Sequence, residues 1–197
     1  MSLLEQYFIE TVEMLDDIGV DFFLHGSTLL GKVRDNVLLE RDGLIADKEL
    51  NFGMMAKDFT PRVYYELVKR NKFFKNSGER LPNGLTYFST YEPMDDMWRL
   101  PAFSLITLYW EGKTKSVEYM GGETCMTWDK KYLEDKSKWE TVELLGKKVK
   151  TPYMKEQFLE DYFGKDYMVE RKVWHYDWGA MNKEILLDLI NEGELCL

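Results

Sequence analysis

Two short segments in the first third of the chain carry residues whose types and spacing suit phosphate chemistry. The first is HGSTLLGKVR at residues 25–34, where a Gly-Ser pair follows an apolar run and precedes a short helical pattern. The second is DKELNFGM at residues 47–54, where two acidic residues stand one residue apart at the start of an expected strand. Because the first N–H groups of a helix lack intrahelical acceptors, the Gly26-Ser27 turn offers hydrogen-bond donors to a phosphate.

The acidic pair indicates a cation beside that phosphate. Residues i and i+2 of a strand point to the same face, so Asp47 and Glu49 can aim both carboxylates at one point. Mg²⁺ takes oxygen ligands from one or two carboxylates, and substrate phosphates complete its shell. Asn51 continues the alternation, which leaves one polar face that either solvent or an active cleft would satisfy. The two segments together predict a metal-assisted phosphoryl or nucleotidyl transfer site.

Length, composition and charge narrow the class of protein to which the chain belongs. At 197 residues, 45% hydrophobic and 15% aromatic, the chain predicts one folded domain over residues 1–197. A formal charge of −9 makes nucleic acid and anionic membrane surfaces poor partners. Cys125 and Cys196 lie far apart, which argues against a disulfide framework or a zinc site. No signal peptide and no bilayer-spanning apolar run is visible, so we expect a cytoplasmic protein.

The apolar patterns predict the elements that must position the two segments. Residues 2–18 read as an amphipathic helix with Ser2 and Glu5 as a capping box, and Gly19 ends it. A buried strand at 20–25 leads to a short helix that Ser27 caps, and a second strand covers 49–55. Thr60-Pro61 begins a further helix that runs to about residue 71.

The second half of the chain predicts mostly antiparallel strands and two more helices. Short strands are expected at 73–76 and 85–91, and hairpins at 103–120 and 141–150, whereas 121–138 reads as polar and turn-rich. Thr151-Pro152 is expected to begin a helix to Phe163, and a last helix spans about 178–191. The class is therefore α+β, with a core at about residues 5–168 and a C-terminal helix at 178–191.

At these motifs the chain resembles the LicD/fukutin-type family of the nucleotidyltransferase superfamily. The resemblance rests on GSTLLGKVR at residues 26–34, DKELNFGM at 47–54, GKKVKTP at 146–152 and YFGKDY at 162–167. It implies a nucleotidyltransferase-like mixed sheet flanked by helices. It also implies an enzyme that transfers a substituted phosphate, such as phosphocholine or a polyol phosphate, from a CDP-activated donor to a glycan with Mg²⁺.

The resemblance also implies roles for individual residues. Asp47, Glu49 and Asn51 match the acidic run of the family and would hold the metal. Arg34 matches the family's arginine, whose forked donors neutralise phosphate charge. The implied catalytic residues are Asp47, Glu49 and Arg34, and the implied cofactor-binding residues are Gly26, Ser27 and Lys32.

Two departures from the family pattern lead to an alternative hypothesis. The family usually has Asp where this chain has Asn51, and it supplies a further acid from a later strand. In this chain Thr107 stands at about that place, and Glu111 or Glu118 are the acids that could substitute for it. The alternative is a catalytically degenerate domain of the same fold that serves as a binding or assembly module. A third possibility is nucleotidyl transfer to a protein or an RNA.

Two histidines have competing interpretations. His25 precedes the Gly-Ser turn, where a packed or hydrogen-bonded imidazole is a commoner role than a general base. His175 lies in WHYDW at residues 174–178, which fits either an acceptor-sugar platform or an aromatic cluster that anchors a helix.

Overall fold

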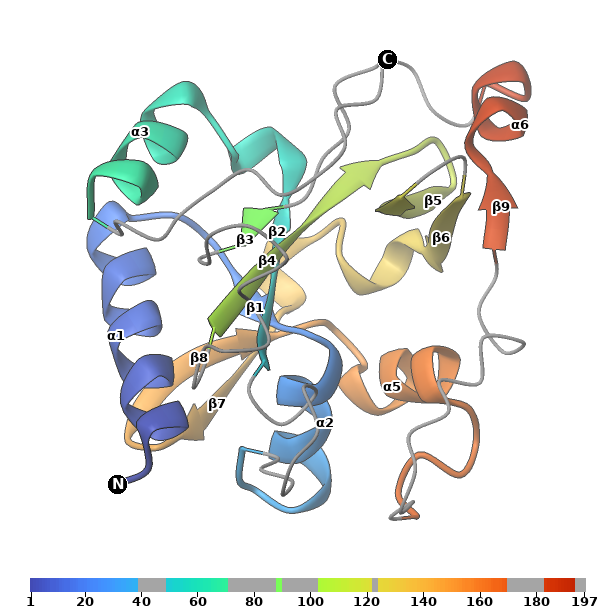
Figure 1. Ribbon diagram of the computed structural model, residues 1–197. Coiled ribbons are helices and arrows are strands. Elements are labelled where there is room, and N and C mark those ends of the chain that lie inside the picture. Colours follow the sequence, from blue (N-terminus) through green and yellow to red (C-terminus); the bar gives the residue numbers. More distant parts are fainter. Residues whose placement is uncertain (39–48, 71–87, 90–102, 122–123, 170–182, 194–197) are drawn as a thin grey trace.

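The computed structural model describes residues 1–38, 49–70, 88–89, 103–121, 124–169 and 183–193 (Figure 1). Within these ranges the strands are β1 (Phe23–Leu24), β2 (Glu49–Met55), β3 (Phe88–Ser89), β4 (Phe103–Glu111), β5 (Lys115–Gly121), β6 (Thr124–Asp129), β7 (Glu140–Leu144), β8 (Lys147–Thr151) and β9 (Lys183–Ile185). They form a mixed sheet in the order β7-β8-β1-β2-β4-β5-β6-β9, with β3 also paired to β4. The pairs β1–β8 and β2–β4 are parallel, and the other pairs are antiparallel.

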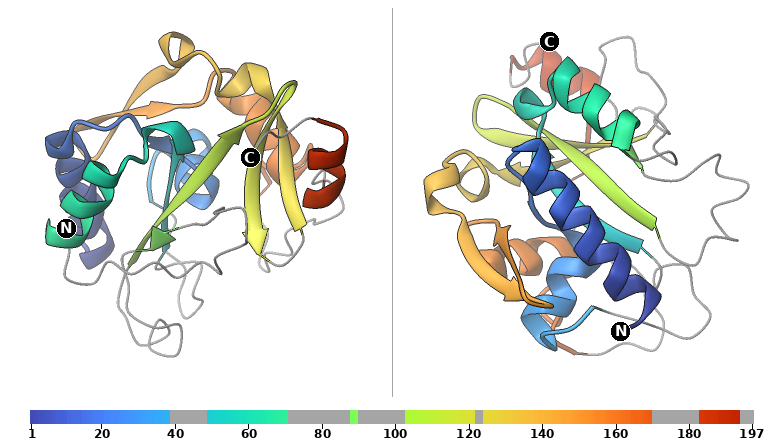
Figure 2. Two further views of the ribbon diagram at one scale, coloured as in Figure 1. Left: turned by 90° about the horizontal axis from the view of Figure 1, so that it is seen from above. Right: turned by 90° about the vertical axis from the view of Figure 1, so that its left-hand side faces the viewer.

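Helices flank this sheet, which confirms the predicted α+β class. The α-helices in the described ranges are α1 (Leu3–Ile18), α2 (Gly26–Arg34), α3 (Pro61–Arg70), α5 (Lys155–Phe163) and α6 (Leu186–Asn191). The short 3-10 helices are η2 (Ala56–Asp58), η3 (Lys130–Tyr132) and η4 (Lys136–Lys138). Helix α1 contacts α3 and α2 contacts α5, and the two pairs are well separated in Figures 1 and 2. None of the described helices combines the length and apolar character needed to cross a bilayer.

The predicted apolar stripe of α1 packs on one face of the central strands. Leu4, Phe8, Val12 and Leu15 are buried, and the ring of Phe8 stacks on Phe52 of β2 with 6.0 Å between centroids. Because side chains alternate along β2, Phe52 and its neighbours at i±2 form the apolar parity that the sequence predicted. The opposite parity, which includes Asn51, faces the side of the sheet where α2 lies.

An aromatic stack covers that second face. Trp128 of β6 stacks on Phe158 of α5 at 4.5 Å and on Tyr162 at 5.3 Å between ring centroids. Offset aromatic stacking adds stabilisation beyond the area that the rings bury. Helix α5 is thereby held against β6.

The structure differs from the sequence predictions in three elements. Residues 124–129 form strand β6 where a turn-rich segment was expected, because pairing with β5 supplies hydrogen bonds that local pattern does not reveal. Helix α5 begins at Lys155 and not at Thr151, because Thr151 ends β8 and Met154 takes a left-handed φ of 53°. The C-terminal helix covers only Leu186–Asn191 of the described residues and follows β9.

Several predicted features lie outside the described residues. These are the loop before residue 47, Asp47 itself, the strand at 73–76, and the aromatic cluster at 174–178 with His175. Of the strand expected at 85–91, the described part is Phe88–Ser89, which is a strand.

Candidate functional site

The Gly-Ser turn lies between β1 and α2 and is tied directly to β2. The backbone N–H of Asn51 donates to Thr28 Oγ1 at 2.7 Å, and Asn51 Nδ2 donates to Ser27 Oγ at 2.9 Å. In return, the backbone N–H of His25 donates to the carbonyl oxygen of Asn51 at 3.0 Å. The structure therefore brings together the two segments that the sequence analysis singled out.

Gly26 is required by this close approach. Its φ of 51° lies in the left-handed region, which disfavours residues with a Cβ. A Cβ at this position would also lie 3.3 Å from Cγ of Asn51. The missing side chain at residue 26 thus favours the close packing of the first turn of α2 against β2.

Ser27 does not cap α2, which corrects the sequence prediction. The N-cap is His25, and its side chain makes no capping hydrogen bond. Ser27 lies inside the first turn, where its hydroxyl accepts the hydrogen bond from Asn51 instead. Its Oγ therefore lies at the junction of the turn with β2.

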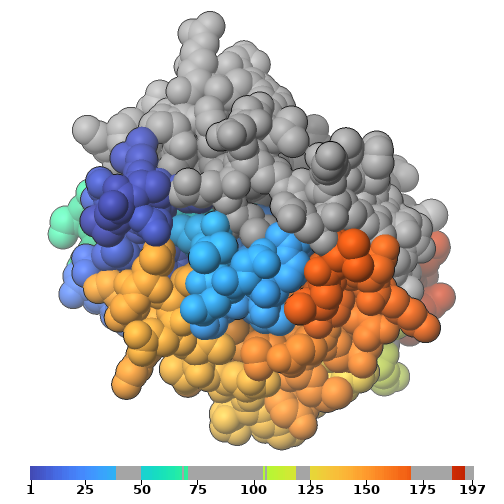
Figure 3. All heavy atoms as spheres, turned by 90° about the horizontal axis from the view of Figure 1, so that it is seen from below, coloured from blue at the N-terminus to red at the C-terminus, as the bar shows by residue number. Residues whose placement is uncertain are grey.

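The start of α2 retains donors that the helix itself does not use. The first backbone bond of the helix runs from Leu29 N–H to the carbonyl oxygen of His25 at 3.1 Å. The N–H groups of Gly26, Ser27 and Thr28 precede it and have no intrahelical acceptor. In Figure 3, α2 lies at the molecular surface between the β7–β8 hairpin and α5.

The predicted metal ligands are described in part. Asp47 lies outside the described residues, and Glu49 is described only as the first residue of β2, at the same strand parity as Asn51. Asn51 is 9% exposed, and its Nδ2 is directed at Ser27. The described residues contain no group of three His, Cys, Asp or Glu side chains that could hold a metal ion. The predicted ligand set of Asp47, Glu49 and Asn51 therefore remains a prediction.

Arg34 and Lys32 lie toward the other end of α2 and contact their own neighbours. Arg34 Nε donates to Asp35 Oδ2 at 2.7 Å, and its buried Nη1 has no acceptor among the described residues. Lys32 Nζ donates to Oδ1 of Asn36. Five residues of helix, about 7.5 Å along its axis, separate Lys32 from Ser27. The structure does not bring the Lys32 side chain to the Gly-Ser turn.

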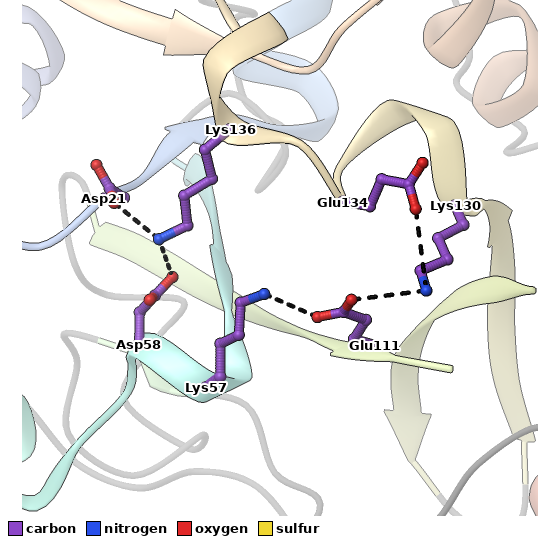
Figure 4. Close-up of polar contacts among 7 residues, drawn as sticks. All are labelled: Asp21, Lys57, Asp58, Glu111, Lys130, Glu134 and Lys136. Atoms are coloured by element: carbon purple, nitrogen blue, oxygen red, sulfur yellow. Dashed lines mark hydrogen bonds and ion pairs between the residues drawn. The ribbon is translucent and has the colours of Figure 1, made fainter. Parts of the chain in front are cut away.

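The third acid is absent from the place where the family pattern expects it. On β4, Leu105 pairs with Asn51 and Thr107 pairs with Gly53. Glu111 is six residues beyond Leu105, roughly 20 Å along the strand. It forms ion pairs with Lys57 at 2.8 Å and Lys130 at 3.6 Å (Figure 4).

The charge state of Glu111 fits this surface role. The hydrogen bond from Lys57 is the main cause that lowers the pKa of the Glu111 carboxyl. Glu111 therefore belongs to a network of surface charges and not to the surroundings of the turn.

Glu118 is the acid that the structure brings close to the turn. It is 7% exposed and accepts a hydrogen bond from the hydroxyl of Tyr109 at 3.0 Å. Its other oxygen lies 3.5 Å from Nε2 of His25. Burial, followed by the nearby Glu118 carboxylate, raises the pKa of Tyr109, so this phenol keeps its proton. His25 is thus hydrogen-bonded and buried, as the commoner of its two interpretations expected.

Sequence reasoning gave Tyr109 no role, because nothing in its local pattern distinguishes it from an ordinary core tyrosine. It lies on β4 inside the run SLITLYW, which reads simply as a buried strand. Only the pairing of β4 with β5 places Glu118 opposite it.

Comparison with known proteins finds similar chains among the solved structures. No family model and no curated protein sequence matches the chain, so the LicD/fukutin-type resemblance remains a prediction. Among solved structures, the chain is similar to lincosamide antibiotic adenylyltransferase LnuA bound to lincomycin, a member of the nucleotidyltransferase superfamily. The identity is 13%, the match covers 91% of this chain and 96% of that one, and the TM-score is 0.46. A similarity at this level supports no conclusion about donor, acceptor or reaction.

Proposed function

We propose that the chain is a Mg²⁺-dependent transferase that moves a substituted phosphate from a CDP-activated donor to a glycan. The observation that carries the proposal is the pair of hydrogen bonds from Asn51 to the hydroxyls of Ser27 and Thr28. These bonds hold the N-terminus of α2 against the strand on which Glu49 stands. We propose that the N–H groups at the start of α2 bind phosphate beside a metal ion held by the acids at the start of β2.

In the proposed site the chain's own groups bind and orient the donor diphosphate. The N–H groups at the start of α2 and the hydroxyl of Ser27 donate to phosphate oxygens. Transfer of this kind depends chiefly on positioning and on neutralising charge, so few groups that take up protons are required.

The proposed donor set fits a hard cation. Since Asn51 Nδ2 is engaged with Ser27, the amide oxygen is the atom that can face an ion. Together with the carboxylates of Asp47 and Glu49 this gives oxygen ligands only, as Mg²⁺ prefers. The ion would neutralise the diphosphate of the donor.

The test is calorimetric binding of a CDP-activated alcohol, such as CDP-choline or CDP-ribitol, with and without Mg²⁺. We expect Mg²⁺-dependent binding that Glu49→Gln weakens by about tenfold or more, because a metal ligand is lost. Glu10→Gln on the exposed surface of α1 is the matched control and should bind like the unaltered chain. Metal-independent binding, or equal affinity of the two variants, would overturn the proposal.

A catalytically degenerate binding module is the second candidate. It is favoured by the neutral Asn51, whose amide is already bonded to Ser27, and by Leu105 at the paired position of β4. This candidate predicts nucleotide binding that survives chelation of divalent ions, with no turnover. Asn51→Asp separates the two: it adds a ligand charge and should tighten Mg²⁺ binding if the carboxylates of Asp47 and Glu49 converge there. No change in Mg²⁺ affinity would favour the degenerate module.

A further inference from the structure

His25 takes part in the backbone hydrogen bonds that hold the Gly-Ser turn in place. Its backbone N–H donates to Asn51 of β2, and its carbonyl oxygen accepts the first helical bond of α2 from Leu29. The next residue is Gly26, and Ser27 follows. Any displacement of the His25 backbone therefore moves the residues proposed to contact phosphate.

The side chain of His25 is held from two strands that the backbone bonds do not involve. Nδ1 lies 2.9 Å from the hydroxyl oxygen of Tyr109 on β4, and Nε2 lies 3.5 Å from Oε1 of Glu118 on β5. The ring of Tyr162 on α5 meets the imidazole edge-on at 5.3 Å between centroids. His25 is 1% exposed, so this arrangement is closed to solvent.

The hydrogen-bond pattern assigns the proton on Nδ1. Tyr109 has one hydroxyl proton, and it donates that proton to Glu118 Oε2 at 3.0 Å. The hydroxyl oxygen can then only accept from His25. With the Tyr109 proton on Glu118, we assign a proton to Nδ1 of His25, which donates it to the Tyr109 oxygen.

We infer that Glu118 and Tyr109 are positioning residues that act through His25 to hold the Gly26-Ser27 turn against Asn51. Strand β1, which leads into the turn, is only two residues long. The buried imidazole supplies a second anchor, because its partners on β4 and β5 belong to the body of the sheet. The inference deepens the proposed function and rests on it for its effect on turnover, while its effect on the turn stands alone.

The test uses Tyr109→Phe, which removes the bridging hydroxyl and keeps the buried ring. We expect the His25 side-chain nitrogen signals to lose the pattern of a protonated Nδ1, and the backbone amide signals of Ser27 and Thr28 to shift. The chain contains two histidines, so comparison with His175→Gln assigns the His25 signals. Both readouts come from nitrogen-proton NMR spectra of the full chain.

A matched control separates this role from general core packing. Tyr132 is also 1% exposed, and its hydroxyl also donates to a carboxylate, that of Asp161 at 2.5 Å. Tyr132→Phe should leave the signals of His25 and Ser27 unchanged. Should Tyr109→Phe fail to fold, Glu118→Gln tests the same link, since it removes the charge and replaces one of the two acceptor oxygens with a donor while retaining the side-chain shape.

Turnover gives the second readout. If the proposed transferase activity exists, Tyr109→Phe should lower kcat by about tenfold or more while KM changes little, because misplaced groups weaken transition-state contacts. Unchanged NMR signals of the turn, or unchanged turnover in an active enzyme, would overturn the inference. Shifted turn signals in a chain that binds no nucleotide would overturn the proposed function and leave the positioning role standing.

Discussion

Among single residues, Gly53 is a motif glycine whose missing side chain allows close packing in the core. It lies in the DKELNFGM segment with the predicted metal ligands, yet its own role is to leave room for the ring of Phe23 from β1. A Cβ on Gly53 would lie 2.2 Å from Cε2 of Phe23. That ring cannot retreat easily, because it packs on Tyr109 at 5.5 Å and on Trp139 at 4.9 Å between centroids.

Gly53→Ala should therefore lower the free energy of unfolding by about 1–3 kcal/mol, the usual cost of overpacking a core. Urea denaturation followed by tryptophan fluorescence would measure it. The double variant with Phe23→Leu should lose less than the sum of the two single losses, because the smaller side chain makes room. Strict additivity would contradict the proposed clash.

At the scale of elements, α1 is defined by local signals at both ends. Ser2 Oγ accepts from the N–H of Glu5 at 3.2 Å, and the Glu5 carboxylate accepts from the N–H of Ser2 at 2.6 Å. Gly19 ends the helix in the left-handed conformation with φ of 73°. Both features were predicted from residue types alone, since caps depend on neighbours three or four residues apart.

Ser2→Ala should reduce stability by about 1 kcal/mol, because it removes the side-chain acceptor of the capping box. The expected change is a lower midpoint of urea unfolding at an unchanged slope. Ser2→Gly is the control and should lose only a few tenths of a kcal/mol, since glycine is itself tolerated at an N-cap. A full loss in both variants would show that the serine acts in another way.

At the scale of the whole molecule, surface ion pairs connect segments that are distant in sequence. Lys136 of η4 contacts Asp21 and Asp58, both at 2.7 Å, and so links the residues before β1 to η2 (Figure 4). Burial acts to lower the pKa of Lys136, but the hydrogen bonds to the two carboxylates outweigh it and raise that pKa. The Lys57–Glu111–Lys130 network extends the same surface.

Lys136→Met should cost at most about 1 kcal/mol of stability at low salt, because the pairs are partly exposed to solvent. The loss should shrink in roughly 1 M NaCl, where screening is nearly complete over this distance. Thermal unfolding at the two salt concentrations measures both effects. Lys165→Met, at an exposed position, is the control and should show neither a loss nor a salt dependence.

The features that depend on short-range patterns of residues could be predicted from the sequence. These are the capped helix α1, the strand β2 with its alternating parity, the hairpins β4–β5 and β7–β8, and hence the α+β class. It also indicated that the Gly-Ser turn and the strand after it belong together, which the bonds from Asn51 confirm.

The residues that support the Gly-Ser turn could be identified from the tertiary structure alone. His25 and Tyr109 are 84 residues apart, and β4 and β5 must pair before Glu118 can meet either of them. Residues 124–129 likewise form a strand that pairs with β5 and β9, two segments outside their local sequence. Local periodicity indicates which face of an element is apolar. Sheet order and register depend on contacts between distant segments, and those contacts cannot be read from the local pattern of a single sequence.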